Sequence, residues 1–472
     1  MSNPLPGISR REVLQSLGVA GAGLALGCRQ SGDSGDPLTK LRAEIARLVQ
    51  KTPFIDTHEH LPDEADRLAG SGLPCDDWSL LFHDYLQSDL ASAGMPPSEL
   101  AAFFSSNVDP QRKWQILEPF WPEVINTGFG RAVRISMRQL YGVESLEADS
   151  IPRLQEAYED LRRPGMYEKI LAQESNIESC QVNTDGLPFH ESRQPTLLLQ
   201  DLSFQTLHMD LDVERLSRRA GIAVRSLEDW HEVIRWWFDR YGKYAAAAKS
   251  QGAYLRRINY HRVDQGEAAP VFAQRLRGEH LEFARIKLLQ DHLFWFCVDQ
   301  ATRHQLPVKI HTGYLSGKKL KDFRHITQHP HDIIELCRQA QDTKFVFLHI
   351  AYPYWQELIA IAKRFPAAHI DMSWAWALDP AGATEFLKRF LVSAPRNKVF
   401  TFGGDYSVVE CIVGYAAMAR QGISQALVEL VEDGWLMQPE AIELVEPLLR
   451  GNAKKTFRLE EKTRTLSKAP WA

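Results

Sequence analysis

The sequence predicts an α/β protein that folds as a (β/α)8 TIM barrel with a helical insertion after its first strand. Three observations indicate this class. Short apolar runs alternate with longer helical patterns along the 472 residues. Several of these runs end in a histidine or an aspartate, and a barrel of parallel strands places its site residues at such strand ends. The first run, residues 53–55, leads directly into Asp56-Thr-His-Glu-His60.

His58 and His60 form the most informative pattern in the chain. Residues two apart on a strand project to the same face, so both imidazoles can reach one metal ion. An H-x-H pair alone is weak evidence, because short histidine pairs occur by chance. Its value rises because later apolar runs end in His311, His349 and Asp405.

The expected elements follow in order. Residues 41–49 have helical spacing and lead into the first strand. Residues 61–174 are too long for one loop, and we interpret about 61–150 as a helical insertion over the barrel mouth, with barrel helices resuming near 151–174. Further strands are expected at 177–182, 196–202 and 245–249, and then in the runs that end at His311, His349, Asp371 and Asp405.

The fourth strand conflicts with its own composition, since Ala245-Ala-Ala-Ala-Lys249 favours helix. Its position argues for a strand, because one is due between the helical pattern at 225–244 and the long helix at 291–304. Helices at 424–435 and 438–449 are expected to close the barrel or pack beside it.

Residues 1–38 are interpreted as an export signal and linker, and residues 39–472 as the barrel. Arg10 and Arg11 precede an apolar stretch that is too short to span a membrane, and the pair resembles a twin-arginine signal. Ala25-Leu-Gly-Cys28 resembles a lipobox, which makes Cys28 a candidate lipid anchor. The alternative is an N-terminus with a chance arginine pair. We expect an exported protein, periplasmic or on the cell surface.

Charge and cysteine content restrict the partners. The net charge is −5 without a block of basic residues, so nucleic acid is not an expected partner. Five cysteines remain besides Cys28, with no C-x-x-C pair, which argues against a disulfide framework or a zinc ribbon and predicts buried thiols. A small-molecule substrate is expected, and the oligomeric state is left open.

Taken jointly, these motifs resemble the amidohydrolase superfamily: D-x-H-x-H after the first strand, histidines after the fifth and sixth, and aspartate after the eighth. Lys249-Ser-Gln-Gly-Ala-Tyr254 and Phe402-Gly-Gly-Asp-Tyr406 add to the resemblance, which points to the amidohydrolase-related branch near uronate isomerases. The resemblance extends over most of the chain after the N-terminal segment.

The chemistry can also be argued from residue types. A divalent ion, with Zn²⁺ the first choice, favours imidazole nitrogens and one carboxylate, with one position open for water. His58, His60 and either His311 or Asp405 can supply these ligands for one or two ions. Such an ion lowers the pKa of bound water to about 7, and Asp405 can take up the proton. His349 can complete a second metal site or polarise a substrate carbonyl.

The resemblance implies that Lys249 is carbamylated and bridges two metal ions. The alternative is an ammonium group that binds a substrate carboxylate. Tyr254, Trp374 and Trp376 are expected to bind substrate, with core packing of one tryptophan as the alternative. His292 is expected to be structural. Three further histidines are expected to lie in a solvated loop rather than in a metal-binding lid: His325, His329 and His331.

The leading functional interpretation is a metal-dependent hydrolase that attacks a C–N or C–O bond of a small polar molecule. The second is an isomerase or non-oxidative decarboxylase that uses the metal as a Lewis acid, which the uronate-isomerase-like features favour. The third is a metal-retaining binding protein without catalysis. The complete ligand set argues against this third interpretation.

Overall fold

The computed structural model describes residues 37–184, 186–316 and 324–471. It divides into two units, Met1–Lys40 and Leu41–Ala472, and the barrel is formed by the second. The expected signal segment and Cys28 lie outside the described residues. Among the described helices, none combines the length and apolar character that crossing a membrane requires.

Parallel strands form the centre of the barrel. One sheet contains β1 (Phe54–Glu59), β2 (Ile177–Val182) and β3 (Leu198–Gln200), and the other runs in chain order through β4 (Leu202–Ser203), β5 (Ala248–Ser250), β6 (Val308–Ile310), β7 (Phe345–Phe347), β8 (Ala368–Asp371) and β9 (Val399–Phe400). Asp201 alone separates β3 from β4, so together they form one barrel strand.

The residues after β9 close the barrel against β1. Thr57 N donates a hydrogen bond to Phe402 O at 3.0 Å, and Asp405 N donates to His58 O at 2.8 Å. Eight strand positions therefore form a ring, and the predicted (β/α)8 barrel is confirmed.

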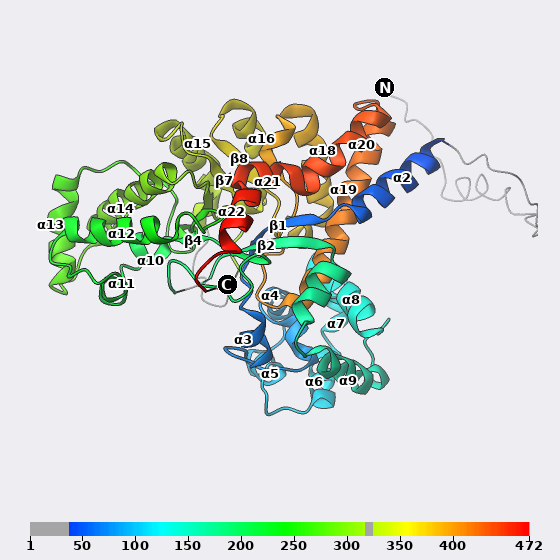
Figure 1. The fold of residues 1–472 in the computed structure, drawn as a ribbon. Coiled ribbons are helices and arrows are strands. Elements are labelled where there is room, and N and C mark those ends of the chain that lie inside the picture. Colours follow the sequence, from blue (N-terminus) through cyan, green and yellow to red (C-terminus); the bar gives the residue numbers. More distant parts are fainter. Residues whose placement is uncertain (1–36, 185, 317–323, 472) are drawn as a thin grey trace, which may run out of the picture. The chain divides into compact units, whose positions relative to one another are not determined.

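Helices cover the strands and form the insertion (Figure 1). Their bounds are α2 (Pro37–Lys51), α3 (Glu64–Leu68), α4 (Tyr85–Ser92), α5 (Pro97–Phe103), α6 (Pro110–Leu117), α7 (Trp121–Val124), α8 (Gly128–Tyr141), α9 (Ile151–Leu161), α10 (Gln205–His208), α11 (Val213–Ala220), α12 (Leu227–Tyr241), α13 (Gln265–Leu276), α14 (Phe283–Arg303), α15 (His329–Gln339), α16 (Trp355–Arg364), α17 (Ala375–Leu378), α18 (Pro380–Ser393), α19 (Ile412–Glu432), α20 (Gln438–Glu446), α21 (Asn452–Phe457) and α22 (Leu459–Leu466).

The alanine-rich segment behaves as its position predicts. Ala245, Ala246 and Ala247 are buried and non-helical, and β5 begins directly after them. The preceding helix ends at Tyr241 because the chain must enter the barrel wall there. Tertiary packing overrides the helix propensity of alanine. Two other helices begin earlier than expected, α14 at Phe283 and α19 at Ile412.

The barrel interior changes from apolar to polar along the strands. Ile55, Leu199, Val346 and Phe400 form an apolar cluster with Phe457 of α21, which closes one end. Burial of each such side chain contributes about 1.5–3 kcal/mol. The polar residues described below follow the strands at their carboxyl ends, where a barrel carries its site.

Helices α3–α8, shown in blue to cyan in Figure 1, lie within the predicted insertion. Helix α9, which was expected as a barrel helix, gathers with them. Arg67 of α3 binds these helices together, because its guanidinium donates to Asp76 Oδ1 at 3.0 Å and to Tyr158 Oη at 2.7 Å. The same group pairs with Glu410, which precedes α19. A buried arginine with three partners fixes the insertion to the C-terminal part of the barrel.

Candidate metal centre

The histidine pair of β1 faces a carboxylate. Asp405 Oδ1 lies 3.1 Å from His58 Nε2 and 3.3 Å from His60 Nε2. Asp405 adopts a left-handed backbone conformation with φ of 57°. That conformation turns its side chain towards β1 while its N–H still pairs with the carbonyl of His58.

His349 reaches the same point by leaving its strand. The strand ends at Phe347, and His349 takes φ 64° and ψ 24°. His349 therefore does not continue the side-chain alternation of Phe345 and Phe347. His349 Nε2 lies 3.6 Å from Asp405 Oδ2. The ligand atoms of His58, His349 and Asp405 all lie within 4.8 Å of one another.

Two imidazole nitrogens face each other without a proton between them. His349 Nδ1 lies 3.0 Å from the Ser373 carbonyl, and His311 Nε2 lies 3.0 Å from the Tyr314 carbonyl. A carbonyl only accepts, so each of these nitrogens carries the ring proton. The other nitrogens, His349 Nε2 and His311 Nδ1, then present lone pairs to each other at 3.1 Å. A cation is the group that satisfies such a pair, so the residues fit a metal ion.

The protonation states agree with this geometry. Burial lowers the pKa of His349 to about 4, and burial with the nearby Lys249 ammonium lowers the pKa of His58 well below its usual value. Burial alone raises the pKa of Asp405, but His349 and His58 outweigh it and the pKa is lowered overall. Neutral imidazoles and an ionised carboxylate are the forms that bind metals.

Lys249 lies beside this cluster. It belongs to β5, and its Nζ is 2.9 Å from His58 Nε2. Burial lowers the pKa of Lys249 to about 8, against the opposing effect of Asp405. The position is compatible with both roles considered for it, a bridge between metal ions and a substrate-binding cation.

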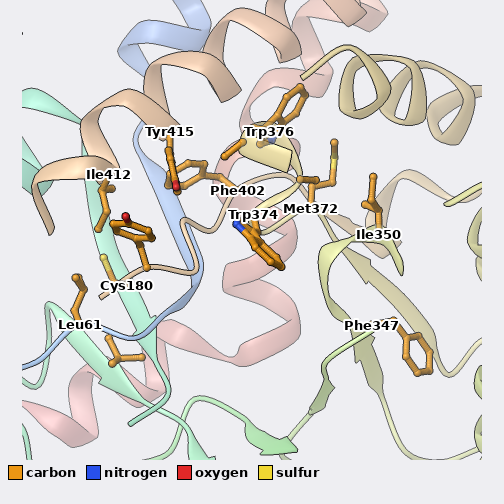
Figure 2. Packing of buried hydrophobic residues seen from close by; sticks show 14 of the residues in the cluster. Leu61, Cys180, Phe347, Ile350, Met372, Trp374, Trp376, Phe402, Ile412 and Tyr415 are labelled. Carbon is orange, nitrogen blue, oxygen red and sulfur yellow. The ribbon is translucent and has the colours of Figure 1, made fainter. Parts of the chain in front are cut away.

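Tyr254 and Trp374 flank the cluster. The Tyr254 ring lies 4.5 Å from the His311 ring, and the Trp374 ring lies 5.3 Å from the His349 ring, measured between centroids. Trp376 does not. Its indole N–H donates to the Thr401 carbonyl at 2.7 Å, and its ring is in the core, pointing away from Trp374 (Figure 2). Trp376 thus has the core packing that is the alternative expected for one of the two tryptophans, because the short helix α17 turns its ring away from the cluster.

Other histidines lie outside the cluster. His329 is fully buried and accepts a hydrogen bond from Gly313 N at 2.9 Å, so the expected solvated loop is wrong at this position. His292 contacts His231 at 3.0 Å and the Val263 carbonyl at 2.8 Å, which is the structural role expected for it. All five described cysteines are free and buried, as predicted.

Two residues at the site carried no sequence signal. Tyr85 of α4 donates a hydrogen bond from its hydroxyl to Asp405 O at 2.5 Å, and the same hydroxyl lies 3.2 Å from Asp405 Oδ2. Glu59 accepts from Gly404 N at 3.0 Å and from Tyr406 N at 2.8 Å, so it holds the loop that carries Asp405. A Cβ on Gly404 would come within 2.2 Å of Glu59 Oε1, which explains the glycine there.

Comparison with known proteins finds similarity to one family model and to several solved structures. A family model described as Amidohydrolase matches residues 265–459. The fold resembles a uronate isomerase of Thermotoga maritima, with a TM-score of 0.71, 16% identity, and 89% and 97% of the two chains covered. It also resembles a glucuronate isomerase of Caulobacter crescentus, with a TM-score of 0.72, 17% identity, and 93% and 97% covered. The findings support the amidohydrolase superfamily.

Two further similarities are more distant or shorter. A candidate metal-dependent hydrolase of Lactobacillus casei has a TM-score of 0.60 and 16% identity, with 89% of this chain and 98% of that chain covered. Protein fluG of Emericella nidulans is 22% identical over 163 residues, which are 34% of this chain and 18% of that protein. The match thus spans less than a fifth of that curated relative, and the structural likenesses concern the fold alone.

Proposed function

We propose that the protein is a metal-dependent hydrolase of the amidohydrolase superfamily, acting on a C–N or C–O bond of a small polar substrate. The observation that carries this proposal is the pair of bare nitrogens, His349 Nε2 and His311 Nδ1, 3.1 Å apart. They lie beside Asp405, His58 and His60. A site with more imidazoles than one ion needs suits one or two divalent ions, of which zinc is our first choice.

A bound divalent ion would supply Lewis acidity and lower the pKa of water at the site. The side chains of the site supply the proton transfer and the substrate contacts. Asp405 Oδ1 lies beside His58 and His60, which would hold the ion. It can therefore accept a proton from the attacking water and return it to the leaving group. Tyr85 steadies Asp405 by donating to its carbonyl. Tyr254 and Trp374 exclude water from either side. Lys249 would either hold two ions as a carbamate or bind an acidic group of the substrate.

An isomerase or non-oxidative decarboxylase is the second candidate. Tyr85 and Asp405 favour it, because they place a carboxylate that can move a proton between adjacent carbons 3.2 Å from a phenol that can donate to a substrate oxygen. The two isomerases that share the fold add support at the level of architecture. Export to the periplasm or the cell surface, with Cys28 as lipid anchor, is proposed from the N-terminal sequence. A non-catalytic metal-binding protein is the remaining alternative.

The test is a substrate panel on metal-loaded protein, with amides, lactones, uronates and aromatic or aliphatic carboxylic acids. Hydrolysis of an amide or a lactone, abolished in His349→Ala, is the expected result. His304→Ala serves as the matched control, since this histidine pairs with Asp239 away from the site. Conversion of uronates without hydrolysis of any ester or amide would establish the second candidate instead. If the metal-loaded protein is inactive on all of these substrate classes, the non-catalytic metal-binding protein is the remaining interpretation.

A further inference from the structure

A recess on the outside of the insertion is lined by charged residues that take no part in the metal site. It has a volume of 390 Å³ and lies between α8 and α19. Arg131, Arg134 and Arg138 of α8 line one wall, and Ala417 and Gln421 of α19 line the other. Positions i, i+3 and i+7 share one face of a helix, so the three guanidinium groups converge on one space.

The opposite face of α8 serves the metal site. Phe129 packs against Tyr85 at 5.4 Å and against Trp374 at 6.2 Å between ring centroids. At about 100° per residue, Arg131 and Arg138 lie roughly 180° around the helix from Phe129. The recess is thus separated from the site aromatics by the thickness of one helix, about 10 Å.

The protein balances the positive charge in the recess only in part. Arg131 donates to Gln421 Oε1 at 2.7 Å. Within the described part of the chain, Arg134 and Arg138 make no side-chain hydrogen bond or ion pair. They are also four residues apart on one helix, so their charges repel each other. Glu144 is the single acidic residue among those that line the recess, against three arginines.

The adjoining surface is different, which shows that the imbalance is local. A neighbouring cavity of 330 Å³ shares Arg131 and Gln421 with the recess. Its acidic side chains are paired: Glu385 with Arg389 at 2.5 Å and Glu429 with Lys388 at 2.7 Å. An ordinary solvated helix face carries such mixed pairs. The face of α8 carries cations that face an open volume.

We infer that the α8 recess is a binding site for a compact anion with two or more negative charges, of the phosphate or polycarboxylate class. Guanidinium groups bind both classes through paired, charge-assisted hydrogen bonds. Gln421 adds an amide that can donate to an uncharged oxygen of the same ligand. The site is independent of the metal centre and of the reaction carried out there.

The test is isothermal titration of the full chain with inorganic phosphate and, separately, with tricarballylate. Stronger chelators such as citrate are avoided because they would remove metal from the barrel. The double variant Arg134→Gln/Arg138→Gln should lose affinity at least tenfold for the preferred anion. Arg219→Gln/Arg364→Gln removes the same charge from exposed positions elsewhere and should bind as the wild type does.

The two titrants distinguish the sources of the anion. A tenfold preference for phosphate assigns the site to phosphate esters, and the reverse preference assigns it to polycarboxylates. Binding should weaken in added salt, since the recess is open to solvent. Equal affinity in wild type and in Arg134→Gln/Arg138→Gln would overturn the inference, as would equal losses in the two double variants. Undetectable binding of both anions at low ionic strength would also overturn it.

Discussion

Lys249 Nζ lies 2.9 Å from His58 Nε2, and neither side chain is exposed to solvent. The nitrogen that His58 offers to a metal is therefore the same nitrogen that Lys249 contacts. Lys249 must move or change its chemical state when His58 binds an ion. A carbamate at Lys249 converts this competition into shared ligation, whereas a free ammonium must turn towards substrate.

Lys249→Ala separates these two states. If Lys249 is a carbamate bridge, the variant should bind about one metal ion where the wild type binds two, and short carboxylates should partly restore activity. If it binds substrate, metal content should stay the same and KM for an acidic substrate should rise. Elemental analysis with steady-state kinetics makes the distinction. Unchanged metal content together with unchanged KM would exclude both roles.

Metal content is expected to depend on the histidine pair. Purified wild-type protein should contain at least one equivalent of a divalent ion, and His58→Ala/His60→Ala should lose both the ion and the activity. The reason is that both nitrogens lie within 3.3 Å of Asp405 Oδ1. His304→Ala is the control and should keep its metal. An active wild-type preparation without metal by elemental analysis would refute this assignment.

Asp405→Asn tests proton transfer. The amide keeps the volume of the side chain and one oxygen but cannot accept the proton, so kcat should fall by about 10²–10⁴. The loss of metal should be smaller, because the imidazoles remain. Tyr85→Phe is the companion variant and should have a milder effect, since it removes a hydrogen bond to Asp405 without removing the carboxylate. Near-normal kcat in Asp405→Asn would show that another group moves the proton.

The sequence predicted the barrel because apolar runs and ligand-type residues coincide at strand ends. Residues 177–182 form β2 as expected, and β5 follows the alanine run. Prediction failed where the backbone leaves regular structure. Strand parity could not describe His349 or Asp405, since both adopt left-handed conformations after their strands. No periodic pattern reports such a turn.

Long-range partners were also beyond the sequence. Tyr85 reaches Asp405 across an interval of 320 residues, and nothing in a helical pattern marks that contact. Lys309 lies in a short apolar run, yet its ammonium is buried against Asp201 at 2.8 Å and the Thr57 carbonyl at 2.7 Å. A buried lysine is tolerated only with such partners, and its partners are visible only in three dimensions.

The Asp63–His190 pair should make stability depend on pH. Asp63 Oδ2 lies 3.3 Å from His190 Nε2, and Asp63 also accepts from Ser192 Oγ at 2.5 Å and Arg193 N at 2.9 Å. The hydrogen bond to Asp63 raises the pKa of His190. Burial alone raises the pKa of Asp63, but bonds from His190 and Ser192 lower it overall. These contacts join the segment before β3 to the start of the insertion.

The two shifts define the pH range in which the pair stabilises the fold. A raised histidine pKa contributes fully below the unfolded value of about 6.5 and is lost as pH rises through the folded value. A lowered aspartate pKa contributes above about 3.9 and is lost as pH falls. The pair should therefore stabilise the protein most near pH 5–6. Because His190 is 40% exposed at its side chain, we expect about 1 kcal/mol or less. Urea unfolding of wild type and His190→Gln should differ at pH 5.5 and converge at pH 8.5, with His280→Gln as the control for an exposed histidine. A difference between wild type and His190→Gln that is constant over this range would show that the charge on His190 does not stabilise the fold.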